Sequence, residues 1–252
     1  MGYWQKKVRA GNTIEITKYK SGRKNLKIII APKSSETSDK QKRQNDKNAE
    51  NKCRWLINTN FKAGDWWIYL TYPAKVRPTK EKAKADIDKF FRDIRKVYRK
   101  SNKELKYIMT AGIGKRGAVH FHLVMNYIEA QKIADIWRQI AGTEETPYPR
   151  MEFIPMDSRK NHSDLASYII KNTLESFYDI NRRIYAQRFC KSRNLKKPKI
   201  KVEKISAKNW RAPKAPKGYY IDKQYTYEGY NDDGHQYQHY ILVKIATDED
   251  DS

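Results

Sequence analysis

The run Val119-His120-Phe121-His122-Leu123-Val124-Met125 follows a glycine-rich turn at residues 112–117. Its β-branched, aromatic and long apolar residues predict a buried β-strand. Successive side chains of a strand point to opposite faces, so His120 and His122 are predicted to lie side by side on one face. Two neutral imidazoles in this arrangement are suited to bind a metal ion. The alternative is a pair of histidines on a half-exposed strand with no ligand.

Three further segments predict strands of the same sheet. Residues 66–72 are aromatic and β-branched, which favours a central strand that ends at Pro73. Residues 105–110 are expected to form a hairpin with residues 119–125 through the glycine-rich turn. Residues 151–154 predict a short strand.

Helical spacing of apolar residues predicts three helices. Residues 79–100 predict an amphipathic helix with Thr79 as its N-cap, whose basic side is expected to be a solvated face rather than a DNA contact. Residues 130–140 predict a second helix, and a third begins with Ser163 or Asp164 as its N-cap. Strands and helices in this order predict an α+β fold, with a central antiparallel sheet and helices packed on its faces.

The two ends of the chain differ in character from this middle part. Residues 13–19 and 25–30 predict two strands. The polar residues 32–51 are either a mobile loop or a solvated helix, and their composition favours a loop followed by a short helix. We expect one domain over residues 1–180. Residues 181–252 are expected to form a basic, tyrosine-rich C-terminal region that packs on this domain or extends it, with a hairpin strand near its end and an acidic tail.

Composition indicates a polyanionic partner. The formal net charge is +24, from 53 Lys and Arg against 29 Asp and Glu, and 18 Tyr and 6 Trp are interleaved with the basic residues. This combination favours single-stranded nucleic acid, because bases stack on aromatic rings and phosphates attract cations. No apolar run approaches membrane-spanning length and the N-terminus lacks a signal-peptide core, so we expect no membrane partner. Two cysteines without paired spacing are consistent with a reducing cytoplasm.

Tyr168 and Lys171 lie three residues apart in the third predicted helix, and are therefore neighbours on one helical face. A phenol, with an ordinary pKa of about 10, is a poor nucleophile until a cation or metal stabilises its phenolate. Lys171 provides such a charge and is able to hold a phosphate oxygen. The alternative is a packed tyrosine beside a surface lysine.

Taken together, these motifs resemble those of the HUH endonucleases, and more closely those of the single-tyrosine rolling-circle replication initiators (Rep) of phages and plasmids. Residues 68–72 resemble their first motif strand, His120-Phe121-His122 their metal motif, and Tyr168-Ile169-Ile170-Lys171 their nucleophile motif. Residues 114–120 resemble the turn that these proteins place before their histidines. By motif, the resemblance covers roughly residues 66–175, within the expected domain at 1–180.

The resemblance implies a metal-dependent DNA nickase and ligase with an HUH/RRM-like fold. His120 and His122 would hold Mn²⁺ or Mg²⁺, and Tyr168 would attack the scissile phosphate of single-stranded DNA to form a 5′-phosphotyrosine. Lys171 would stabilise the developing charge.

The resemblance also implies the substrate and partners of such an enzyme. The substrate would be an origin hairpin, contacted by Thr71 of the first motif strand and by Lys115 and Arg116 of the turn. The sequence lacks the phosphate-binding loop of an NTPase, so a host helicase and DNA polymerase would be needed, in the cytoplasm of a bacterial host.

One position departs from the family pattern. Family members with this turn usually carry a glutamate where this chain has Gly112, and that glutamate completes the metal site. Related small transposases take the third ligand from the tyrosine helix, which corresponds to Asn172, and Asp164 lies one turn before Tyr168. We hypothesise Asn172 or Asp164 as the replacement, or water and substrate phosphate. A weakened or inactive metal site is the alternative. Two other functions stay open: a transposase-like nuclease, which the long C-terminal region disfavours, and a non-catalytic single-stranded DNA-binding protein.

Overall fold

The computed structural model describes residues 2–21, 38–157, 160–206, 211–230 and 234–245. The chain forms two compact units, one drawn from residues 1–45, 158–161 and 197–252 and the other from residues 46–157 and 162–196. This division differs from the boundary at residue 180 expected from the sequence, because the two ends of the chain share one sheet.

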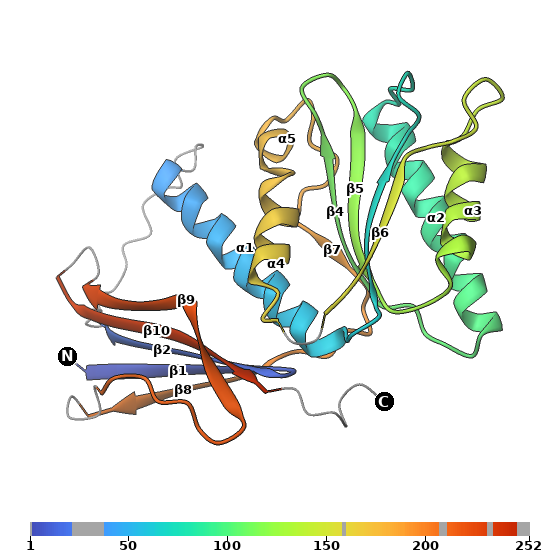
Figure 1. Cartoon of the computed structure of the whole chain (residues 1–252). Helices are drawn as coiled ribbons and strands as arrows, with labels where there is room; N and C mark the ends of the chain where they lie inside the picture. Colours follow the sequence, from blue (N-terminus) through green and yellow to red (C-terminus); the bar gives the residue numbers. More distant parts are fainter. Residues whose placement is uncertain (1, 22–37, 158–159, 207–210, 231–233, 246–252) are drawn as a thin grey trace. The chain divides into compact units, whose positions relative to one another are not determined.

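The second unit is a five-stranded antiparallel sheet with helices on both faces (Figure 1). The strand order is β6-β3-β5-β4-β7, so the histidine strand β5 is central and β3 lies beside it. The strands are β3 (Trp66–Thr71), β4 (Tyr107–Ile113), β5 (Val119–Met125), β6 (Met151–Pro155) and β7 (Cys190–Lys191). The helices are α1 (Asp39–Asn60, of which residues 46–60 belong to this unit), α2 (Lys80–Lys100), α3 (Ala130–Ala141), α4 (Ser163–Lys171) and α5 (Leu174–Tyr178). The predicted α+β architecture is confirmed.

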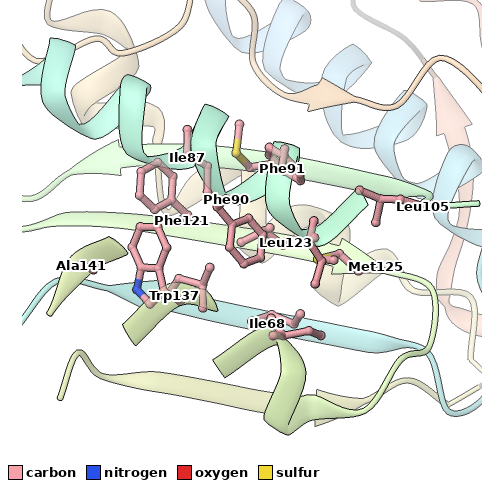
Figure 2. Packing of buried hydrophobic residues seen from close by; sticks show 14 of the residues in the cluster. Ile68, Ile87, Phe90, Phe91, Leu105, Phe121, Leu123, Met125, Trp137 and Ala141 are labelled. Carbon is pink, nitrogen blue, oxygen red and sulfur yellow. The ribbon is translucent and has the colours of Figure 1, made fainter. Parts of the chain in front are cut away.

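Alternation along β5 divides the core between the two faces of the sheet. Phe121 and Leu123 point toward α2 and α3, where they pack with Phe90 and Trp137 (Figure 2). Val124 belongs to the second cluster, on the opposite face, with residues of α1 and α4. His122 and His120 lie two and four residues before Val124 on the strand, so their side chains point to the same face of the sheet as Val124, the face covered by α4.

The predicted helix caps are borne out in one case and wrong in another. Thr79 caps α2, where its side chain accepts a hydrogen bond from the backbone N–H of Lys82 at 3.2 Å. Helix α4 is preceded by His162, in the left-handed conformation with φ of 53°, and no side chain caps it. Ser163 does not serve as the cap because its Oγ accepts a hydrogen bond from Arg54 at 3.0 Å instead.

The loop expected over residues 32–51 is wrong where the structure describes it. Helix α1 already begins at Asp39, and ion pairs one turn apart, such as Lys47 with Glu50, support its polar half. The apolar face of α1 starts only at Ala49, which is why the preceding residues have the composition of a loop.

The first unit is a second five-stranded antiparallel sheet, in the order β8-β1-β2-β10-β9. A tight turn at Gly11, with φ of +55°, joins the first two strands. The strands are β1 (Gly2–Ala10), β2 (Thr13–Ser21), β8 (Lys199–Ile205), β9 (Tyr219–Tyr230) and β10 (Gln236–Lys244). The strand at residues 13–19 and the C-terminal hairpin strand are confirmed, β1 was not foreseen, and the strand expected at 25–30 and the acidic tail lie outside the described residues.

Two further sequence expectations concern the membrane and the cysteines. Within the described ranges, no helix combines the length and the apolar character needed to cross a membrane. Cys53 and Cys190 are both free thiols, and Cys53 is fully buried.

Candidate active site

His120 and His122 lie side by side on β5, with their ring centroids 5.4 Å apart and their planes at 75°. Cross-strand pairing fixes their neighbours: His122 is opposite Tyr69 of β3 and Thr110 of β4, and His120 is opposite Gly112 of β4. His122 is 1% exposed and His120 is half-buried. The sequence-based placement of both imidazoles on one face is correct.

Both imidazoles have buried ring nitrogens without a hydrogen-bond partner among the described residues: Nδ1 and Nε2 of His122, and Nε2 of His120. Burial, reinforced by the nearby His120, lowers the pKa of His122 to about 3. Burial also lowers the pKa of His120, although hydrogen bonds to the backbone of Ala118 and Asn172 oppose the shift. Both rings are therefore neutral at pH 7. Because unpaired buried nitrogens are costly, they point to a ligand from outside the chain.

Helix α4 is held over strands β4 and β5 by polar contacts along its length. The buried hydroxyl of Thr110 donates to the carbonyl of Ile169 at 3.0 Å. At the start of the helix, His162 Nδ1 hydrogen-bonds Asn58 Oδ1 of α1 at 2.7 Å, and Ile169 and Ile170 are buried in the core. The position of α4 over β5 is thus defined at both ends.

This placement brings Tyr168 of α4 onto the histidines. Its ring meets the ring of His122 edge to face, with centroids 5.4 Å apart and planes at 88°. Trp67 of β3 holds it from another side, with centroids 5.3 Å apart and planes at 73°. Tyr168 nevertheless remains 47% exposed. A phenol that is held in place, reachable from solvent and beside two neutral imidazoles has the arrangement that a nucleophile beside a bound cation would need.

An open depression on α4 surrounds Tyr168. Lys171 and Asn172 are exposed and line it with Tyr168, and Asp164 and Ser167 complete the lining. The structure thus places Lys171 beside Tyr168 on one helical face, as expected from the spacing.

Asp164 and Asn172, the two residues proposed from the sequence as a third metal ligand, differ in their position relative to the histidines. The described part of the chain contains no group of three His, Cys, Asp or Glu side chains placed to hold a metal, so Asp164 does not join the two histidines. Asn172 comes closer, since its backbone hydrogen-bonds the ring of His120. A Cβ added at Gly112 would stand 2.6 Å from His120 Nε2, so the ring of His120 occupies the space into which a larger side chain at residue 112 would project.

Two aromatic residues of the site were missed from the sequence. Besides Trp67, Tyr69 contacts both histidines, with its ring centroid 4.9 Å from that of His122 and 6.0 Å from that of His120. Burial raises the pKa of Tyr69, and the nearby Tyr168 adds to the rise. The signal was available, because Trp67 and Tyr69 alternate along β3 and face the same side as the histidines.

The predicted DNA-contacting residues lie at the His120 end of the sheet. Thr71 pairs with His120 across the strands, and its hydroxyl donates to the carbonyl of Arg150 at 3.0 Å. Lys115 and Arg116 are exposed in the turn between β4 and β5. Arg77 Nε donates to the carbonyl of Arg116 at 3.0 Å, which steadies this turn.

These residues fit a divalent cation in part. Two neutral imidazoles with unpaired nitrogens suit a borderline ion such as Mn²⁺ better than Mg²⁺, which prefers oxygen ligands. The remaining positions would fall to Asn172, water or substrate oxygens.

Comparison with protein families finds a match to part of the chain. The model of the family described as Replication-associated protein ORF2/G2P matches residues 65–175, a segment that runs from β3 through α4 and contains His120, His122 and Tyr168. No curated protein and no solved structure matches the chain significantly. The matched segment is less than half of the chain, and over this segment the chain is similar to a replication-associated family.

Proposed function

We propose that this protein is a rolling-circle replication initiator that nicks and rejoins single-stranded DNA through a covalent bond to Tyr168. The observation that carries the proposal is the edge-to-face contact of the exposed Tyr168 with the buried, unpaired His122. The match of the same segment to a replication-associated family supports it.

The proposed reaction is a phosphoryl transfer without hydrolysis. The phenol oxygen of Tyr168 attacks the scissile phosphorus in line as the bond from phosphorus to the 3′ oxygen breaks. The products are a 5′-phosphotyrosine and a free 3′-OH; the phenol proton leaves to water and the 3′ oxygen takes one up. One ester bond replaces another, so the same site is able to rejoin strands. Lys171, one helical turn from Tyr168, stabilises charge on the phosphoryl oxygens.

His120 and His122 would hold the cation, Mn²⁺ or Mg²⁺, which when bound would polarise the scissile phosphate. Because both rings are neutral, their nitrogens are free to act as ligands at neutral pH. We assign the third protein ligand to the side-chain oxygen of Asn172, with water or substrate phosphate in the remaining positions.

The substrate follows from charge and position. A net charge of +24 favours DNA, and Thr71, Lys115 and Arg116 at the His120 end of the sheet would guide the strand toward Tyr168. An origin hairpin would present this strand, and a host helicase and DNA polymerase in the bacterial cytoplasm would continue from the 3′-OH.

A second candidate is a non-catalytic single-stranded DNA-binding protein, which the glycine at residue 112 favours because the expected carboxylate ligand is missing. A transposase-like nuclease would share the chemistry of Tyr168 and differ only in its DNA target.

The test is a covalent-adduct assay with an origin-strand oligonucleotide and Mn²⁺, read by denaturing electrophoresis. Wild-type protein is expected to form an adduct that Tyr168→Phe abolishes. Tyr69→Phe is the matched control, since it removes a hydroxyl from the same site and is expected to retain the adduct. Salt-sensitive binding without any adduct would establish the non-catalytic candidate instead.

A further inference from the structure

A basic groove lies along the β4–β7 edge of the second unit, away from Tyr168. Three segments line it: the end of α2, the connection from α2 to β4, and residues 191–194. They contribute five cations, Arg95, Arg99, Lys103, Lys191 and Arg193, and one acid, Glu104.

The positive charge of this groove is not neutralised by the chain. Among the described residues, Arg95, Arg99, Lys191 and Arg193 have no carboxylate partner, and Glu104 accepts a hydrogen bond from the amide of Asn194 at 3.2 Å. Other cations of α2 do have such partners: Lys82 pairs with Asp86, and Lys96 pairs with Asp93 at 2.8 Å. Uncompensated like charges in one groove repel one another, and a polyanion relieves this repulsion.

The backbone that carries these cations is held in place. Ser192 is buried; its Oγ accepts from the N–H of Tyr107 at 3.1 Å and its own N–H donates to the carbonyl of Tyr107 at 3.0 Å. Asn194 also donates to the carbonyl of Leu105 at 3.2 Å. Lys191 and Arg193, on either side of Ser192, are exposed. Little ordering of the backbone is therefore needed when a ligand binds.

The lining favours a phosphate backbone over unpaired bases. Tyr107 is the one aromatic ring in the lining, and its face is stacked on Phe91, with centroids 3.9 Å apart and planes at 24°. Proteins that bind single strands use free aromatic faces as stacking platforms. A groove with several cations and no free ring suits duplex DNA, whose bases are already stacked.

The groove is separate from the histidine site. Tyr107 packs against α2, whereas the histidines face α4 on the other side of the sheet (Figure 1). Along β4, Tyr107 is opposite Met125 at one end of β5, whereas His120 is near the other end. We infer that this groove binds the phosphate backbone of duplex DNA, independently of the strand that would be nicked at Tyr168.

The test compares two double charge reversals in the Tyr168→Phe background, so that nicking does not affect the result. Arg99→Glu/Arg193→Glu changes the groove, and Lys89→Glu/Lys100→Glu makes the same change in net charge at exposed positions of α2 outside it. Binding of a short labelled duplex, and of one of its strands alone, is followed by fluorescence anisotropy over a range of salt concentrations.

The groove variant is expected to lose about tenfold in duplex affinity at physiological salt, and its slope of log affinity against log salt is expected to fall by about 2. The control variant is expected to keep both values, and single-strand binding is expected to change little in either. The inference would be overturned if the salt slope of the groove variant were unchanged. It would also be overturned if the control variant lost as much duplex affinity as the groove variant, or if the groove variant lost as much affinity for the single strand as for the duplex. If the groove variant does not fold, Arg99→Gln/Arg193→Gln is measured in its place by the same criteria.

Discussion

Gly112 and His120 are cross-strand partners on β4 and β5, and the imidazole lies directly against the glycine. A Cβ at residue 112 would stand 2.6 Å from Nε2 and 2.9 Å from Cε1 of His120, closer than unbonded atoms approach. The orientation of His120 therefore depends on the absence of a side chain at residue 112. The ring of His120 thus fills the space in which the family resemblance leads one to expect a glutamate side chain.

Gly112→Ala is expected to displace the ring of His120 and weaken Mn²⁺ binding about tenfold, because overpacking costs about 1–3 kcal/mol and a tilted ring misdirects its nitrogen. Isothermal titration with Mn²⁺ measures the effect. Gly114→Ala is the matched control, since its Cβ would meet only the carbonyl oxygen of Ala118 at 3.7 Å, an ordinary contact. Unchanged Mn²⁺ affinity in Gly112→Ala would show that His120 is not a ligand.

His122 makes stability depend on pH in the metal-free protein. Burial lowers the pKa of His122 to about 3 from an ordinary value of 6.5. Between these two pH values the imidazole is protonated in the unfolded chain and neutral in the folded protein. The free energy of unfolding should therefore fall as the pH is lowered through this window, by an amount on the order of 2 kcal/mol at about pH 5. Urea unfolding with a chelator present measures it. His122→Leu should show a smaller fall between neutral pH and pH 5, and an identical fall in both proteins would refute the buried neutral state.

Asn172 and Asp164 can be separated by metal titration. Asn172→Ala is expected to lower Mn²⁺ affinity severalfold, because Asn172 lies beside His120. Asp164→Ala is expected to leave the Mn²⁺ affinity unchanged, because Asp164 does not lie with the two histidines. Equal affinities in wild type and both variants would assign the third position to water and substrate phosphate alone.

Thr110 links the helix of Tyr168 to the sheet. Thr110→Val keeps the shape of the side chain but removes its hydrogen bond to the carbonyl of Ile169, at an expected cost of about 1 kcal/mol in the free energy of unfolding. Thr110→Val should also slow adduct formation, because α4 is then less firmly held over His122. The slowing is expected to be larger than that caused by Lys171→Arg. Normal adduct rates in Thr110→Val would show that this contact is purely structural.

Most of the second unit could be predicted from the sequence. The strands and helices from residue 66 to residue 171 have strong period-2 or helical patterns, so local residues determine them. That the side chains of His120 and His122 lie on the same face of the sheet follows from strand geometry alone. That Tyr168 would reach them could be expected only through the family resemblance, because helix placement on a sheet depends on contacts such as the one between Thr110 and Ile169.

Other features depend on contacts between distant residues. Strand β1 pairs with β8 across nearly the whole chain, for example Val8 with Ile200, and no local pattern encodes that partner. Helix α1 has a polar half that looks like a loop, and its apolar half is recognisable as a buried face only once α4 and the sheet are in place. The fit of Gly112 under His120 depends on a side-chain orientation, which spacing does not specify.

The most direct measurement is peptide mapping by mass spectrometry of the protein after incubation with an origin-strand oligonucleotide and Mn²⁺, followed by nuclease and protease digestion. A nucleotide remnant attached through a 5′ phosphate is expected on the peptide that contains Tyr168, with none in Tyr168→Phe and a normal yield in Tyr69→Phe. A remnant on any other residue, or cleaved DNA with no protein adduct, would contradict the assignment of Tyr168 as the nucleophile.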